Sequence, residues 1–180
     1  TITIYIEPTP EILVDVRDTV CNEDFLTFDV TNPNNPFSGE WRYMVEVDYG
    51  DSITGTLDSL SYFGDEDFTD SLSNSGVYAH EVTYRFVPYI TSIYGDSCMN
   101  WKEEIITVWV NPTPAIRVFT QDSIICNGDS TTIEVYNPNI LVFGAWEYDL
   151  IVTPDTASDG TSYIGGAWES DTTGITTEVI

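Results

Sequence analysis

Apolar and polar residues alternate with period two along most of the chain. In residues 41–48, Trp41, Tyr43 and Val47 fall on one side, while Arg42 and Glu46 fall on the other. Such alternation is typical of a strand with one face in a core. No segment shows the 3.6-residue apolar stripe of an amphipathic helix. Further strands are predicted at 11–16, 25–30, 67–73, 78–88 and 103–110.

Turn-forming residues separate the predicted strands. Residues 32–36 read NPNNP and residues 48–51 read DYGD, and Gly, Pro, Asn and Asp favour turns at such positions. Short strands with a turn about every ten residues predict an all-β fold of the Ig-like β-sandwich type.

The sequence also repeats itself. Matching segments lie 104 residues apart near the start of the chain and 105 residues apart after one inserted residue. An internal repeat of this length indicates two copies of one structural unit. The matches are Pro8-Thr9-Pro10 with Pro112-Thr113-Pro114, Cys21-Asn22 with Cys126-Asn127, Asn32-Pro33-Asn34 with Asn137-Pro138-Asn139, and Trp41 with Trp146.

The repeat sets the expected domain boundaries. Residues 1–8 align with the end of a copy and are predicted to be the last strand of a preceding repeat. Residues 9–111 form a complete Ig-like repeat, and residues 112–180 form a second repeat that stops before its last strands. Two prolines in each linker favour an extended backbone. We therefore expect tandem Ig-like β-sandwich repeats stacked end to end.

The charge of the chain excludes several classes of partner. Its 180 residues include 30 Asp and Glu but 5 Lys and Arg, for a formal net charge of −25. Such a chain repels nucleic-acid phosphates and anionic membrane surfaces. No apolar run reaches the roughly 18–20 residues of a membrane span, so direct membrane insertion is not expected. The 42% hydrophobic and 13% aromatic fractions predict a folded protein.

Several motifs resemble the Ig-like, PKD-like repeats of giant cell-surface adhesins of Bacteroidota, including the gliding-motility adhesins. These motifs are Val110 to Pro114, Cys126-Asn127-Gly128, Trp41, Trp146, Leu72-Ser73-Asn74, Val82-Thr83-Tyr84 through Pro88, and Cys98. The resemblance covers essentially the whole chain. It implies a structural stalk repeat of a long extracellular adhesin or surface filament, exported by the type 9 secretion system. The implied partners are neighbouring repeats, other surface filament proteins and glycans.

The cysteines leave three alternatives open. Cys126 matches Cys21, and the match of Cys98 would fall beyond residue 180, so each complete copy has two cysteines. Cys21 and Cys98 could pair with each other, which would close a long loop. Strand parity in a simple sandwich places them at opposite ends, which favours bridges to neighbouring repeats. Free thiols are the third alternative.

The resemblance also implies O-glycosylation at Asp followed by Ser or Thr and then Ala, Ile, Leu, Met, Thr or Val. Ordinary turn and strand-edge chemistry provides another explanation for Asp-Ser and Asp-Thr pairs. The pattern occurs at Thr19, Ser52, Ser59, Ser71, Ser123, Ser130, Thr156 and Thr172.

No cofactor is expected, although two acidic turns make Ca²⁺ a candidate ligand. The candidate ligands are Asp48 and Asp51 in one turn, and Asp65 and Asp67 in another. Calcium needs six to eight converging oxygens, which a run of acids does not by itself provide. A solvated acidic surface that keeps the protein soluble explains the same residues.

The sequence does not predict an enzyme. His80 is the single histidine, and it alternates with aromatic neighbours on a predicted strand, which is typical of packing. Glycine-rich phosphate loops are absent from the sequence. A Ca²⁺- or carbohydrate-binding β-sandwich module and an accessory domain of a secreted enzyme are the alternatives to a stalk repeat.

Overall fold

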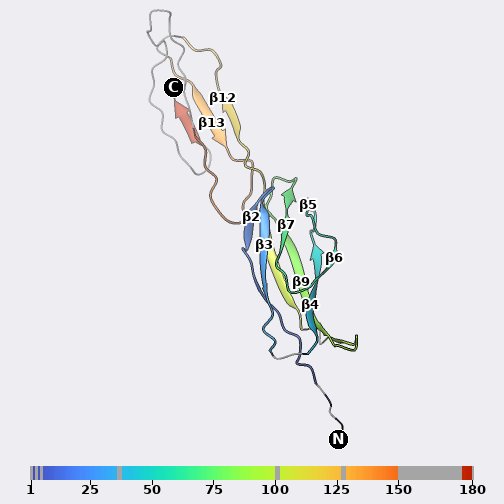
Figure 1. Ribbon diagram of the computed structural model, residues 1–180. Helices are drawn as coiled ribbons and strands as arrows, with labels where there is room; N and C mark the ends of the chain where they lie inside the picture. The colour runs from blue at the N-terminus through green and yellow to red at the C-terminus, as the bar shows by residue number, and fades with distance from the viewer. Residues whose placement is uncertain are drawn as a thin grey trace, which may run out of the picture. The chain divides into compact units, whose positions relative to one another are not determined.

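A computed structural model describes residues 2, 4, 6–35, 38–99, 102–126 and 129–149, together with the backbone of residues 176–179. The chain divides into unit 1, Thr1–Thr113, and unit 2, Pro114–Ile180. All regular structure in these described ranges is β-strand, which confirms the predicted all-β class (Figure 1). Within them no helix has the length and apolarity needed to cross a membrane.

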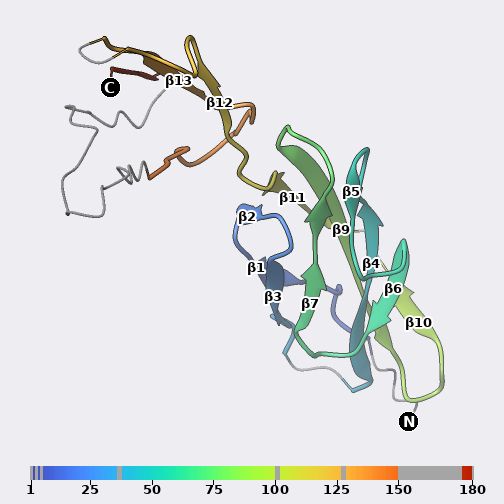
Figure 2. The same ribbon diagram turned by 90° about the horizontal axis from the view of Figure 1, so that it is seen from above.

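Unit 1 contains two main sheets and a short ribbon (Figure 2). The smaller sheet has the order β1 (Leu13–Asp15), β3 (Phe25–Thr31), β7 (Phe68–Ser71). The larger has the order β2 (Thr19–Cys21), β11 (Glu104–Asn111), β9 (His80–Thr91), β4 (Glu40–Asp48), β6 (Leu60–Phe63), and β10 (Ser97–Met99) also pairs with β9. The ribbon joins β5 (Ile53–Thr54) and β8 (Ser73–Asn74). Among these strands, β2 and β11 pair in parallel and the other pairs are antiparallel.

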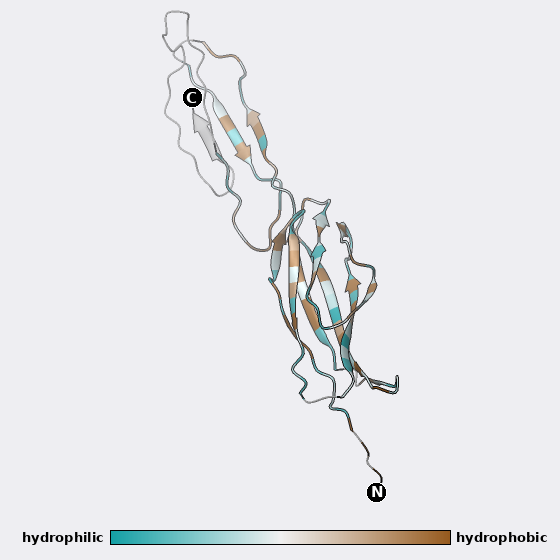
Figure 3. Ribbon diagram, viewed as in Figure 1, coloured by the Kyte–Doolittle hydropathy of each residue, from teal (hydrophilic) through white to brown (hydrophobic). Residues whose placement is uncertain are grey.

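The period-two pattern builds the core between the two sheets. Leu26, Phe28 and Val30 on β3 are buried, and the residues between them are exposed. Figure 3 shows the same alternation of brown and paler residues along the strands of this unit. Phe28 stacks on Phe68 of its own sheet with ring centroids 4.5 Å apart, and it contacts Tyr84 of the opposite sheet at 4.6 Å. Burial of apolar surface on both inner faces therefore joins the sheets into a sandwich.

The observed strands agree with the longer predicted ones. Strands β3, β4, β9 and β11 coincide with the predicted runs to within a few residues. The run predicted at 67–73 is instead divided into β7 and β8. The short strands β2, β5, β6 and β10 were not predicted, because two to four residues are too few to show a period.

The first residues of the chain differ from the expectation of a strand. Residues 2, 4 and 6–8 are not assigned to any strand. The side chains of Ile2, Ile4 and Ile6 are 90%, 78% and 91% exposed. In the aligned strand β11, Val108 and Val110 are fully buried, because β9 and β2 flank that strand on either side. That residues 1–8 form the last strand of a preceding repeat stays a prediction.

Unit 2 contains β12 (Arg117–Thr120), β13 (Thr132–Tyr136) and β14 (Thr176–Val179), with β13 between the other two. In the β12–β13 pair, Arg117 lies opposite Tyr136 and Phe119 lies opposite Glu134. In the β1–β3 pair, Leu13 lies opposite Thr31 and Asp15 lies opposite Asp29. Adding 104 to the residue numbers of β1 and 105 to those of β3 gives the paired residues of β12 and β13. The strand pairing therefore follows the sequence repeat.

Phe28→Ala is expected to destabilise unit 1 by about 3–5 kcal/mol, because it leaves a cavity among the three aromatic rings of Phe68, Tyr84 and Phe86. Phe25→Ala is the matched control on the same strand, since Phe25 is 63% exposed and its loss should cost about 0.5 kcal/mol or less. Native-state hydrogen exchange at the amides of β9 measures unit 1 alone. Equal effects of the two variants would contradict this account of the core.

Candidate functional site

The two ends of unit 1 contain its most specific polar contacts. We call the end where β1 begins and β9 finishes the upstream end, and the end where β2 and β11 finish the downstream end. The antiparallel register places Glu40 opposite Thr91 at the upstream end, and Val110 opposite His80 at the downstream end. The chain therefore enters unit 1 at one end and leaves at the other.

At the upstream end, Asn34 and Trp41 bind the backbone that follows the first linker. The side-chain carbonyl of Asn34 accepts from the Glu11 amide at 2.8 Å, and its amide nitrogen donates to the Thr9 carbonyl at 2.7 Å. The indole Nε1 of Trp41 donates to the Glu11 carbonyl at 3.1 Å. Asn34 is itself oriented by a turn in which its backbone N–H donates to the side-chain carbonyl of Asn32 at 2.8 Å.

The same contacts recur in unit 2. The indole Nε1 of Trp146 donates to the Ala115 carbonyl at 3.0 Å, and the Ala115 amide donates to the Asn139 side chain at 2.7 Å. The backbone N–H of Asn139 donates to the side-chain carbonyl of Asn137 at 2.8 Å. Trp146 also contacts Tyr148 with ring centroids 5.3 Å apart. The equivalent Trp41–Tyr43 distance is 5.5 Å, so the aromatic pair has the same geometry in both units.

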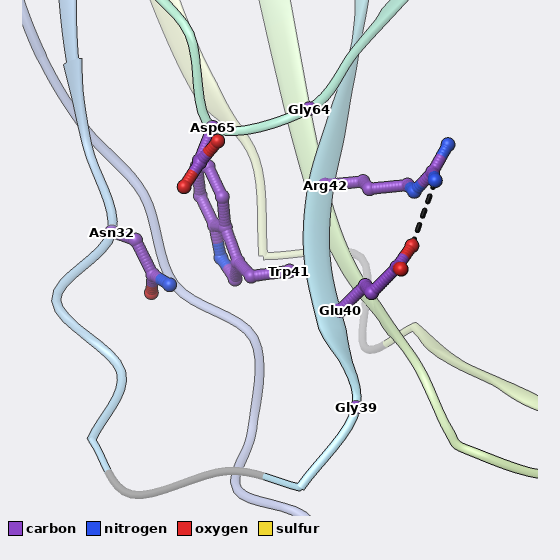
Figure 4. Close-up of a pocket in the computed structure, with 7 residues that line it drawn as sticks. All are labelled: Asn32, Gly39, Glu40, Trp41, Arg42, Gly64 and Asp65. Carbon is purple, nitrogen blue, oxygen red and sulfur yellow. Dashed lines mark hydrogen bonds and ion pairs between the residues drawn. The ribbon is translucent and has the colours of Figure 1, made fainter.

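A shallow hollow of about 390 Å³ lies beside Trp41 at the upstream end. Figure 4 shows the Trp41 ring between Asn32 and Asp65, whereas Glu40 and Arg42 point to the other side of β4. Trp41 is only 4% exposed, so its ring offers no open face on which a sugar could stack. The Glu40–Arg42 ion pair, 2.7 Å long and exposed, adds little stability.

At the downstream end, Asn22 and Asn74 bind the last strand and the second linker. The Asn74 side chain, 3% exposed, donates to the carbonyls of Val110 and Tyr78 at 2.8 Å each. The Asn22 side chain accepts from the Asn74 amide at 2.5 Å and donates to the Thr113 hydroxyl at 2.6 Å. From the sequence neither asparagine has a predicted role, although Asn22 lies in the recurring Cys-Asn pair and Asn74 lies in the Leu72-Ser73-Asn74 motif.

The core of unit 1 contains one fully buried carboxylate, Asp70. It accepts hydrogen bonds from the hydroxyls of Tyr49 and Tyr84, both at 2.8 Å, and from the amide and hydroxyl of Thr56 at 2.7 and 2.9 Å. Burial, together with the charge of Asp70, raises the pKa of both tyrosines. Four donors compensate this carboxylate for its lost hydration, so the arrangement stabilises the fold and offers no free acid for chemistry.

The predicted pairing of Cys21 with Cys98 does not fit this fold. Cys21 lies opposite Asn111 at the downstream end, and Cys98 lies opposite Ile90 near the upstream end. The ten residue steps of β9 from His80 to Ile90 extend about 33 Å. A disulfide needs Cα atoms about 4.4–6.8 Å apart. The alternative pairing with neighbouring repeats stays a prediction, and all three cysteines are free thiols here.

The candidate Ca²⁺ ligands do not come together. Asp48 lies opposite Thr83 toward the downstream end, in the turn that contains Asp51. Asp65 lines the hollow at the upstream end, where the Asp67 carboxylate accepts from the Val30 amide at 2.7 Å. In the described part of the chain, no three Asp, Glu, His or Cys side chains cluster as metal ligands.

The predicted glycosylation positions differ in exposure. Ser52, Ser59, Ser123 and Ser130 are exposed, Thr19 and Ser71 are half-buried, and Thr156 and Thr172 lie outside the described residues. At three positions the residue after the hydroxyl belongs to the core, namely Val20, Ile53 and Leu72. Strand alternation alone thus explains a polar residue followed by an apolar one at those places. The four exposed serines remain the predicted acceptors best accessible to modification.

Comparison with known proteins gives no family assignment. No family model matches the chain, and no curated protein matches it at a significant level. The function is therefore inferred from the geometry of unit 1 and its partial recurrence in unit 2.

Mild oxidation of the folded chain is expected to give no peptide that links Cys21 to Cys98, because the two ends of unit 1 separate them. Peptide mapping under non-reducing conditions checks this outcome. Labelling by iodoacetamide before oxidation should reach Cys21 and Cys126, which are exposed, faster than half-buried Cys98. A linked Cys21–Cys98 peptide from folded monomer would overturn the assigned topology.

Unit 1 is expected to lose stability above pH 10. Burial raises the pKa of Tyr43, Tyr49 and Tyr84 in the folded state above their ordinary value of 10.0. The stabilisation from their protonated forms is therefore complete below pH 10 and declines as the pH rises above it. Phenolate absorbance and hydrogen exchange in β9, measured across an alkaline titration, should change together.

Tyr84→Phe tests the same group directly. It removes one donor from Asp70 and should cost about 1–3 kcal/mol at neutral pH. It should also weaken the alkaline loss of stability, because one raised pKa is gone. Tyr62→Phe is the control, since Tyr62 is 64% exposed. An unchanged alkaline transition in Tyr84→Phe would show that these phenols do not govern it.

Proposed function

We propose that the two units are copies of one Ig-like β-sandwich, and that such copies form the structural stalk of a long extracellular adhesin or surface filament. The stalk would space an adhesive region from the cell. The parallel pairing of β2 with β11, the first and last strands of the larger sheet, carries this proposal.

The sheet order supports an Ig-like assignment. In unit 1, β1-β3-β7 packs against β2-β11-β9-β4-β6, so the N-terminal segment contributes one strand to each sheet. Two antiparallel sheets with this Greek-key connectivity, and a buried tryptophan on a central strand, are typical of the Ig fold. Trp41 on β4 occupies that place.

Recurring contacts support the assignment of unit 2 as a second copy. The β12–β13 register repeats that of β1–β3. Trp146 and Asn139 bind Ala115 as Trp41 and Asn34 bind Glu11. Equivalent backbone and side-chain contacts at one spacing are what tandem repeats produce.

The strand order suits a protein that bears tension along its length. The chain passes from the upstream to the downstream end of unit 1 through β1 and β2 and leaves through β11. A pull on the two termini therefore slides β2 against β11. Because backbone hydrogen bonds between strands lie across the direction of sliding, several must break together, whereas a hairpin opened from its end loses them singly.

The charge of the chain fits an exposed surface polymer. With 30 acidic and 5 basic residues, neighbouring stalks repel each other and remain soluble. Basic side chains of unit 1 form ion pairs with acidic ones. Arg85, for example, pairs with Glu46 and Glu103 at 2.5 Å each. This surface supports an extracellular location and a spacing role for the proposed stalk.

Force spectroscopy on the chain held by its two termini tests the proposal. Val20→Pro removes a backbone donor from β2 and should lower the unfolding force of unit 1, because β2 lies on the path of the load. Ile53→Pro is the matched control: Ile53 is buried like Val20, 5% against 3% exposed, but lies in the β5–β8 ribbon away from that path. Equal loss of force in both variants would argue against a tension-bearing stalk.

A further inference from the structure

The larger sheet of unit 1 has an outer face that points away from the core. On β4, Met44 lies between the core residues Tyr43 and Val45 and so projects from the outer face. The register places Val87 of β9 opposite Met44, and both side chains are buried. A solvated sheet face ordinarily carries polar residues. This face instead has an apolar centre.

Large apolar side chains on the neighbouring strands of the same face are open to solvent. They are Tyr62 and Leu60 of β6, Ile105 of β11 and Met99 of β10. Strand alternation places Tyr62 and Ile105 on the outer face, because the residue that follows each of them packs against the core. Their side chains are 64% and 56% exposed. The apolar surface therefore extends over β6, β4, β9 and β11, which are consecutive in the sheet.

Around the apolar centre, acidic side chains are paired with arginine. Glu46 and Glu103 each contact Arg85 at 2.5 Å. Glu40 contacts Arg42 at 2.7 Å. The chain as a whole has a formal net charge of −25, so two copies repel each other over most of their surface. Repulsion is weaker where arginines compensate the acids.

The outer face of the smaller sheet is acidic instead. Asp15 of β1 lies directly opposite Asp29 of β3, and like charges in such a position repel each other. Leu13 and Phe25 on this face are 59% and 63% exposed, so apolar exposure alone does not distinguish the two faces. Charge does distinguish them, and it favours the larger sheet as the surface that a second copy can approach.

We propose that the outer face of the larger sheet binds the same face of a second copy of this chain. The six strands of the sheet contain 39 residues. At about 16 Å² for each residue they provide about 600 Å² per copy. That area is near the lower limit for specific interfaces, so we expect reversible pairing with a dissociation constant on the order of 100 µM. This inference goes beyond the proposed stalk and does not depend on it.

Sedimentation equilibrium of the full chain at concentrations up to about 1 mM measures the pairing. Tyr62→Glu and Ile105→Glu each place a charge in the apolar face and should raise the dissociation constant by about tenfold or more. Phe25→Glu and Leu13→Glu make the same kind of change at matched exposure on the smaller sheet, and each should alter it by about twofold or less. Hydrogen exchange in β9, measured on the diluted monomer, shows whether each variant remains folded.

The salt dependence distinguishes an apolar contact from a charged one. Raising the ionic strength from about 0.01 M to about 0.15 M shortens the Debye length from about 30 Å to about 8 Å. Repulsion between the two acidic copies then weakens, so the dissociation constant of the unmodified chain should fall severalfold. A dissociation constant that rises with salt would show that charge pairs hold the dimer, and would overturn the inference.

Other occupants of the face give different outcomes. A chain that stays monomeric at about 1 mM would leave the face to a partner other than a second copy, which overturns the inference. Weakening by the smaller-sheet variants alone would place the contact on the opposite face. Pairing that all four variants leave unchanged would place it in unit 2, where Ile116 and Phe119 are also exposed. Either result overturns the inference, and the force measurement still decides the stalk.

Discussion

The structure of unit 1 depends on one change of sheet by its N-terminal segment. β1 pairs with β3 in the smaller sheet, and three residues later β2 pairs with β11 in the larger sheet. This segment therefore joins the two sheets at the surface. In the core they are joined by Phe28, which stacks on Phe68 of its own sheet and contacts Tyr84 of the other. It also makes the first and last strands of the larger sheet parallel, which is why the chain enters and leaves at opposite ends. The separation of Cys21 from Cys98 follows from the same geometry.

Buried polar groups give this sandwich specificity without a disulfide. Asp70 and Asn74 are almost wholly buried, and each is surrounded by partners from distant parts of the sequence. A buried carboxylate that lost its donors would cost far more than one hydrogen bond, so alternative registers of β7 against β3 are disfavoured. Asn74 acts similarly at the downstream end, where it fixes the carbonyl of Val110. The apolar core supplies most of the stability, and Asp70 and Asn74 determine which arrangement of the strands is the most stable one.

The sequence allowed the long strands and the repeat to be predicted because both are periodic. β3, β4, β9 and β11 have enough residues to show alternation, and the Pro-Thr-Pro and Trp matches recur after 104 and 105 residues. The polar site at the ends of unit 1 was not predictable in this way. Asn22 and Thr113 lie 91 residues apart, and only the β2–β11 pairing brings them together. The inward position of Asp70 was equally hidden, since an acidic residue on a strand ordinarily faces solvent.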